Sequence, residues 1–165
     1  QVIERFLGWL ADEGNDGSPR PRAALAAALL VARHGVRIAT LPLLTLAHVE
    51  AADDGWRLRP ADVAASPDDG IALFDDVWTA LCAHWNDRGV VWDRHLAHWR
   101  GDAALLAPPE FPDTGRGRAK RLRASAGYAA SGLDRLLRAS WSKATTKRSA
   151  STQPPTSTKT LSPRA

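Results

Sequence analysis

An arginine surrounded by apolar residues is the first feature of this sequence that could do chemistry. Arg37 follows Gly35 and Val36 and precedes Ile38, at the junction between a long apolar segment and a shorter one. An arginine is seldom placed among apolar residues unless a carboxylate or another anion meets its guanidinium. Two interpretations follow. Arg37 binds an anionic ligand such as a phosphate, or it pairs with an Asp or Glu and anchors the junction.

Basic side chains also gather near the only tyrosine. Residues 116–123 are rich in Arg and Lys, and Tyr128 follows them closely. Such a cluster can hold phosphates, and a tyrosine can attack a phosphodiester. A solvated charged loop and a packed tyrosine are the alternatives. The candidate DNA contacts, two of them on a predicted strand, are Arg57, Arg59, Arg116, Arg118, Lys120, Arg121 and Arg123.

One histidine pair has the spacing of a metal site. His95 and His98 lie three residues apart, which places both imidazoles on one face of a helix. Because no carboxylate cluster accompanies them, we interpret them as packing residues and expect neither a metal nor another cofactor. The single cysteine, Cys82, excludes an internal disulfide and fits a reducing cytoplasm, which is the compartment we expect.

The charge is unevenly distributed along the 165 residues, whose net charge is +4. Residues 100–165 carry 13 Lys and Arg against 4 Asp and Glu, whereas residues 1–99 carry 9 against 14. A basic C-terminal half favours a polyanionic partner, and DNA is the partner that we expect. A solubilising tail is the alternative. No apolar run approaches the ~20 residues that span a bilayer, so we expect no membrane association.

Helices are predicted on both sides of Arg37. The segment from Val2 to Glu13 has apolar residues at helical spacing, and the segment from Ala23 to Arg33 is rich in Ala and Leu. Gly35 ends the second helix, since glycine readily takes the left-handed conformation that follows a helix. The segment from Ile38 to Leu46 predicts a further short helix.

A small sheet and two more helices follow. Glu50 to Gly55 reads as a turn. The alternating run Trp56 to Arg59 and the apolar run Ile71 to Phe74 predict an antiparallel hairpin or small sheet over residues 56–74. Asp75 or Asp76 is the predicted cap of the next helix. Ser131 is the predicted cap of a last helix, which runs to Trp141. Three of the tryptophans fall at apolar helical positions and are expected in the core: Trp9, Trp78 and Trp85.

The C-terminal stretch has a different composition. From Ser142 onward, 11 of 24 residues are Ser or Thr, and Leu161 is the only large aliphatic residue. Such a segment buries too little apolar surface to offset the entropy of ordering it. The sequence therefore predicts a mainly α-helical α+β domain with a small antiparallel sheet over residues 1–141. A disordered tail is predicted over residues 142–165.

The arginine junction resembles the first arginine motif of the tyrosine recombinases, the phage-integrase family. That motif typically reads Gly-Leu-Arg-Ile-Ser-Glu-Leu-x-x-Leu-x-x-x-Asp-Ile. The predicted elements around it occur in the family's order, and the resemblance covers roughly residues 2–140. The chain has no methionine and begins at Gln1, so we interpret it as a fragment. The matching residues here are Gly35, Val36, Arg37, Ile38, Leu41, Leu44 and Val49.

The resemblance implies a role in DNA integration and recombination, without metal or nucleotide, by a homo-oligomer on DNA. Of the family's catalytic residues only the arginine that contacts the scissile phosphate is matched, by Arg37. The hairpin stretch 57–72 holds no lysine, and no His-x-x-Arg box precedes Tyr128. We therefore expect a truncated or degenerate relative that binds DNA and does not cut it alone.

Two other interpretations stay open. A non-catalytic helical or winged-helix regulatory module would use residues 56–74 as its wing and its basic tail on phosphates. A protein-interaction domain would use exposed tryptophans as its contact surface.

Overall fold

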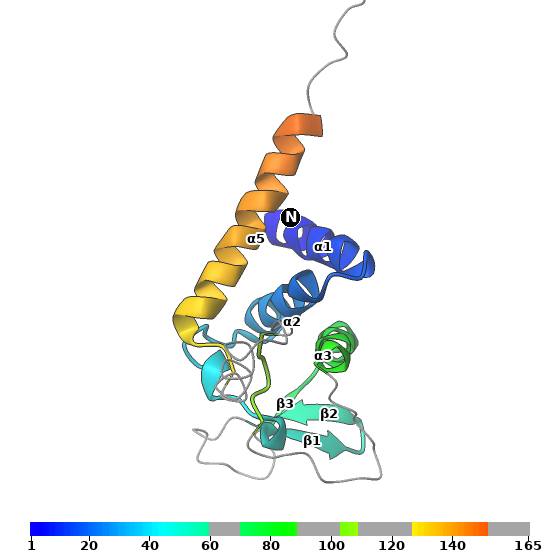
Figure 1. Ribbon diagram of the computed structural model, residues 1–165. Coiled ribbons are helices and arrows are strands. Elements are labelled where there is room, and N and C mark those ends of the chain that lie inside the picture. Colours follow the sequence, from blue (N-terminus) through cyan, green and yellow to red (C-terminus); the bar gives the residue numbers. More distant parts are fainter. Residues whose placement is uncertain (60–69, 89–102, 109–126, 152–165) are drawn as a thin grey trace, which may run out of the picture.

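The computed structural model describes residues 1–59, 70–88, 103–108 and 127–151 (Figure 1). Four helices and a small sheet form these parts of the chain, which confirms the predicted α+β class. The elements are α1 (Val2–Asn15), α2 (Pro19–His34), the 3-10 turns η1 (Leu41–Leu43) and η2 (Leu46–His48), β1 (Val49–Ala52), β2 (Gly55–Leu58), β3 (Ile71–Ala72), α3 (Asp75–Asp87) and α5 (Ala130–Ser151).

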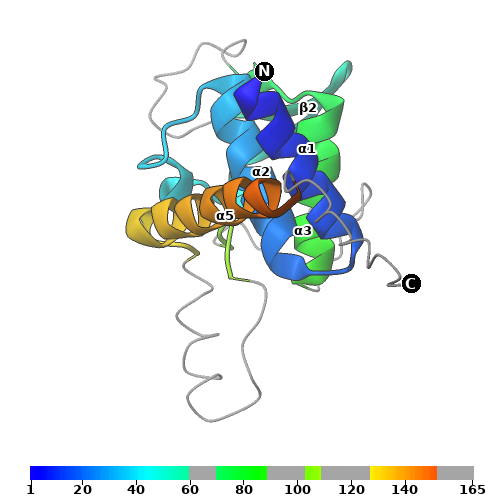
Figure 2. The same ribbon diagram turned by 90° about the horizontal axis from the view of Figure 1, so that it is seen from above.

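Helix α2 is the centre of the packing. Helices α1 and α3 pack on it, and Figure 2 shows α5 lying across α1 and α2. The small side chains of α2 allow this close approach, because its alanines at positions 23, 24, 26, 27 and 28 are all buried. Each helix adds one leucine with no exposed surface to the shared core: Leu10, Leu30, Leu81 and Leu133.

The sheet has the order β1-β2-β3 and is antiparallel throughout. Val49 of β1 pairs with Leu58 of β2, and both side chains are buried. Trp56 of β2 stacks on Trp78 of α3, with ring centroids 4.3 Å apart and planes 4° apart. Trp85, which is 1% exposed, meets Trp78 edge-on. These aromatic contacts join the sheet to α3, and they confirm Trp78 and Trp85 as packing residues.

The helix predicted from Ile38 to Leu46 is wrong. Its residues form η1 and η2, which are separated by extended backbone at Leu44. The Leu44 carbonyl accepts the Leu105 amide at 2.8 Å, and the Leu46 amide donates to the Ala103 carbonyl at 2.9 Å. Pairing with a distant extended segment therefore replaces the local helix that the apolar spacing predicted.

Two boundaries near the sheet also differ from the prediction. The turn expected from Glu50 to Gly55 is shorter, because β1 extends to Ala52 and pairs there with Gly55 of β2. Phe74, not an aspartate, is the N-cap of α3, and Asp75 and Asp76 lie in the first turn. Carboxylates there still favour the helix, because they face the positive end of its dipole.

Helix α5 begins at Ala130 and runs to Ser151, so the prediction of disorder is wrong for residues 142–151. Tertiary contacts explain the extension. Trp141 packs edge-on against Phe6 of α1, with centroids 5.0 Å apart, and Lys147 forms an ion pair with Glu13 of α1. Ser131 lies within the first turn instead of capping it. Residues 152–165 lie outside the described ranges.

Candidate functional site

The turn after α2 presents Arg37 to solvent. Gly35 takes the left-handed conformation, with φ at 65°, and the Val36 amide donates to the Leu30 carbonyl at 3.2 Å, which closes the helix end. The Arg37 carbonyl then accepts the amide of Thr40 at 2.9 Å. Because Val36 on the preceding position is buried, the fixed backbone leaves the Arg37 side chain pointing outward and exposed.

Arg37 differs from most arginines in the described ranges. No described residue forms a hydrogen bond or an ion pair with its side chain. Five other described arginines form ion pairs within the fold. Those with a carboxylate partner are Arg22 with Asp87, Arg33 with Glu4 and Asp76, Arg57 with Asp54, Arg59 with Glu50, and Arg138 with Asp134.

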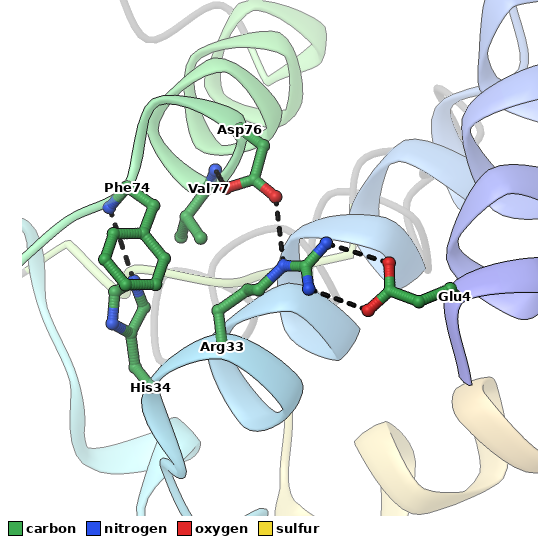
Figure 3. A network of polar contacts seen from close by, with 6 residues as sticks. All are labelled: Glu4, Arg33, His34, Phe74, Asp76 and Val77. Carbon is green, nitrogen blue, oxygen red and sulfur yellow. Dashed lines mark hydrogen bonds and ion pairs between the residues drawn. The ribbon is translucent and has the colours of Figure 1, made fainter. Parts of the chain in front are cut away.

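The arginine that pairs with carboxylates at this junction is Arg33, four residues before Arg37 (Figure 3). Its two terminal nitrogens donate to the carboxylate of Glu4 at 2.7 and 2.9 Å, and its Nε donates to Asp76 at 3.1 Å. These hydrogen bonds, those to Glu4 above all, raise the pKa of Arg33. The anchoring role that the sequence left open for Arg37 is thus filled by its neighbour.

The two hairpin arginines are charge-compensated. Arg57 lies 3.2 Å from Asp54, and Arg59 lies 3.3 Å from Glu50. A surface hollow of about 440 Å³ beside them is lined by both arginines and by the three carboxylates of the hairpin. Phosphate binding by this hairpin would require these ion pairs to open.

The last turn of α3 and its C-cap, Arg88, hold segment 103–107. The ring Nε2 of His84 accepts the Ala107 amide at 3.3 Å, and the indole of Trp85 donates to a carbonyl of the segment at 3.0 Å. Arg88 donates to another carbonyl at 2.8 Å. The segment in turn bonds to the backbone around η1 and η2, so α3 supports the region that follows Arg37.

His84 is buried with no exposed surface, and its Nδ1 has no hydrogen-bond partner among the described residues. Burial lowers the pKa of His84 to about 3, and the positive charge of Arg88 adds to this effect. The imidazole is therefore neutral at physiological pH. It is a structural acceptor for the backbone of segment 103–107.

Tyr128 packs against the core at the start of α5. It is half-buried, and its amide donates to the Leu106 carbonyl at 3.1 Å. Burial raises the pKa of the Tyr128 phenol to about 12, which disfavours the nucleophilic phenolate. The geometry favours the packing interpretation of this tyrosine.

The remaining candidates lie outside the described ranges. These are His95, His98, Arg116, Arg118, Lys120, Arg121 and Arg123. Across the described parts of the chain, no group of three or more His, Cys, Asp or Glu side chains is arranged to hold a metal ion. None of the described helices combines the length and apolar character of a membrane span.

The sequence reasoning missed the face of α2 that carries Arg33 near the junction and Arg22 at the other end of the helix. Arg22, Leu25, Leu29 and Arg33 share one face of α2 through their spacing of three, four and four, and this spacing is the signal that could have identified it. Comparison of the chain with protein-family models, curated proteins and solved structures finds no match.

Proposed function

We propose that this chain is a DNA-binding protein related to the front part of a tyrosine recombinase catalytic domain, in which Arg37 contacts a backbone phosphate. The observation that carries the proposal is the exposed side chain of Arg37, which has no described partner and lies on a turn whose backbone is held by the closed helix end. A planar, permanently charged guanidinium can hold a phosphate through two hydrogen bonds.

The order of the elements supports the same proposal. Two helices lead to the arginine turn, an antiparallel sheet follows, and then a helix that begins with two carboxylates. This is the order that the resemblance to the integrase family implies. Strand cleavage is not part of the proposal, because the described tyrosine is a half-buried packing residue with a raised pKa.

Exposed charge on α5 adds to the attraction for a polyanion. Arg135 and Lys143 are exposed, and no described residue forms an ion pair with either. Like Arg37, they are described surface cations without a carboxylate partner and are available to phosphates.

The first prediction concerns Arg37 itself. Arg37→Ala should weaken binding to a fluorescently labelled DNA duplex by about 10-fold, the size of one lost charge-assisted contact. Arg5→Ala is the matched control, because Arg5 is also exposed and has no described ion-pair partner. Fluorescence anisotropy titrations of the full chain measure both. Equal losses for the two variants would show that only net charge matters and would contradict a specific contact.

The second candidate function is a winged-helix-like regulatory module. It would place the hairpin of β1 and β2 on DNA, so the double variant Arg57→Ala/Arg59→Ala would lose more affinity than Arg37→Ala. We favour the first function, because both hairpin arginines are compensated by neighbouring carboxylates.

A further inference from the structure

A groove between α1 and α3 lies apart from the Arg37 turn. Both helices pack on α2, whose outward face forms the floor of the groove. The space is about 580 Å³, within the range of about 300–1,000 Å³ typical of ligand-binding clefts. Its walls and floor are mostly apolar, and many of the side chains are small. They include Leu7, Gly8, Ala11, Leu25, Leu29 and Ala80.

Two arginines of α2 brace the ends of this groove. At one end Arg33 bonds to Glu4 of α1 and to Asp76 of α3. At the other end Arg22 bonds to Asp87 of α3 at 2.6 Å and to a carbonyl near the end of α1 at 2.8 Å. Because each arginine bonds to both α1 and α3, these contacts fix the separation of the two walls.

The braces also give the groove a length and a direction. They meet α1 at Glu4 and Gly14, ten residues apart, which corresponds to about 15 Å of helix. The amino-terminal ends of α1 and α3 lie together at the Arg33 brace. The two walls therefore run parallel to each other and opposite to α2.

The two ends of the groove differ in charge. Glu4, Asp75 and Asp76 line the Arg33 end, where a single guanidinium leaves two negative charges uncompensated. At the opposite end the charges of Arg22 and Asp87 cancel. An occupant with positive charge at the first end would thus be favoured.

Two exposed apolar side chains are sequence neighbours of the acidic residues at this end. Ile3 and Phe74 immediately precede Glu4 and Asp75, and they are 56% and 54% exposed. They are among the few large apolar side chains exposed in the described ranges. Exposed apolar residues beside an apolar groove are typical of a protein-docking surface.

We propose that this groove binds an amphipathic α-helix of a partner protein, with its apolar face against Leu25 and Leu29 and a lysine or arginine in its last turn beside Asp75. A bound helix that runs antiparallel to α1 and α3 places its carboxyl end at the acidic end of the groove. A basic residue in that turn also suits the dipole of the bound helix. Amphipathic helices that bind in grooves use apolar anchors at positions i, i+3, i+4 and i+7.

A stapled helical peptide provides the probe. It carries leucines at i, i+4 and i+7 and two lysines in its last turn, and calorimetric titration against the full chain measures its affinity. The version with two glutamates in the last turn should bind at least about 10-fold more weakly. Asp75→Lys should abolish this preference, because the two added units of positive charge cancel the two uncompensated negative charges at this end.

A ring added inside the groove should block the peptide. Gly8→Phe should weaken binding at least about 10-fold without lowering the melting temperature, because nothing lies within 4 Å of a Cβ at Gly8. Ala139→Phe adds the same ring to an exposed position of α5 and should leave the affinity unchanged.

Several results would overturn the proposal. Absent binding, equal affinity for both peptides, or binding insensitive to Gly8→Phe would each do so. A dimer dissociated by Gly8→Phe in sedimentation equilibrium would make a second copy the occupant instead. A lowered melting temperature for Gly8→Phe, without peptide binding by the unaltered chain, would assign the groove to another segment of the same chain. None of these measurements depends on DNA binding.

Discussion

Gly127→Ala is expected to lower the free energy of unfolding by about 2–4 kcal/mol, from left-handed backbone strain and overpacking together. Gly127 has φ at +84°, a conformation that costs an alanine energy. Its added Cβ would also lie 2.6 Å from the Cβ of Ala104 and 2.8 Å from the carbonyl oxygen of Leu106. Both contacts are with the central segment 103–107, which cannot move without losing its bonds to α3. Urea unfolding followed by tryptophan fluorescence measures the loss.

Gly132→Ala is the control for this prediction. Gly132 lies within α5, and the nearest atom to its added Cβ is a Tyr128 ring carbon at 3.6 Å, an ordinary contact. An alanine there should stabilise the protein by about 0.5–1 kcal/mol through helix propensity. If Gly127→Ala were as stable as the unaltered protein, α5 would not be joined to segment 103–107 as described.

The second large effect is a loss of stability in mild acid. Because burial lowers the pKa of His84 to about 3 from 6.5, the unfolded chain binds a proton at pH 5 that the folded chain does not. Stability from this group is therefore full above pH 6.5 and falls as the pH decreases toward 3. Between pH 7 and pH 5 the free energy of unfolding should decrease by about 2 kcal/mol.

His84→Gln separates this titration from other effects of acid. The amide oxygen of glutamine can still accept the Ala107 amide, but it does not titrate between pH 5 and 7. The variant should be less stable than the unaltered chain at pH 7, and its urea midpoint should change less between the two pH values. An equal pH dependence in both proteins would exclude His84 as the source.

Local signals explain why the arginine turn could be predicted. Gly35 adopts the left-handed conformation that a glycine after a helix favours, and this conformation sets the direction of the chain at Arg37. The amphipathic spacing of α1 and the Ala-rich composition of α2 were likewise sufficient to predict these two helices, because burial of one helix face follows from sequence spacing alone.

The errors arose where distant parts of the chain compete with local preference. The helix expected from Ile38 to Leu46 gives way to backbone pairing with residues 103–105. Helix α5 extends to Ser151 because Trp141 and Lys147 contact α1, and composition does not reveal that contact. Such tertiary contacts override local propensity.

Local sequence features also did not indicate which arginine of the junction pairs with a carboxylate. Arg33 and Arg37 lie four residues apart, and either could have met a carboxylate. The outcome depends on where α1 and α3 place Glu4 and Asp76, which only the assembled helices determine. The exposure of Arg37 follows from the same arrangement.

The salt dependence of DNA binding tests the role of Arg37 most directly. A plot of log affinity against log salt concentration has a slope of about −0.9 for each phosphate that the protein neutralises on duplex DNA. The slope for Arg37→Ala should be shallower by about 0.9 than that of the unaltered chain, whereas Arg5→Ala should keep the original slope. An identical slope for Arg37→Ala and the unaltered chain would contradict a phosphate contact at Arg37.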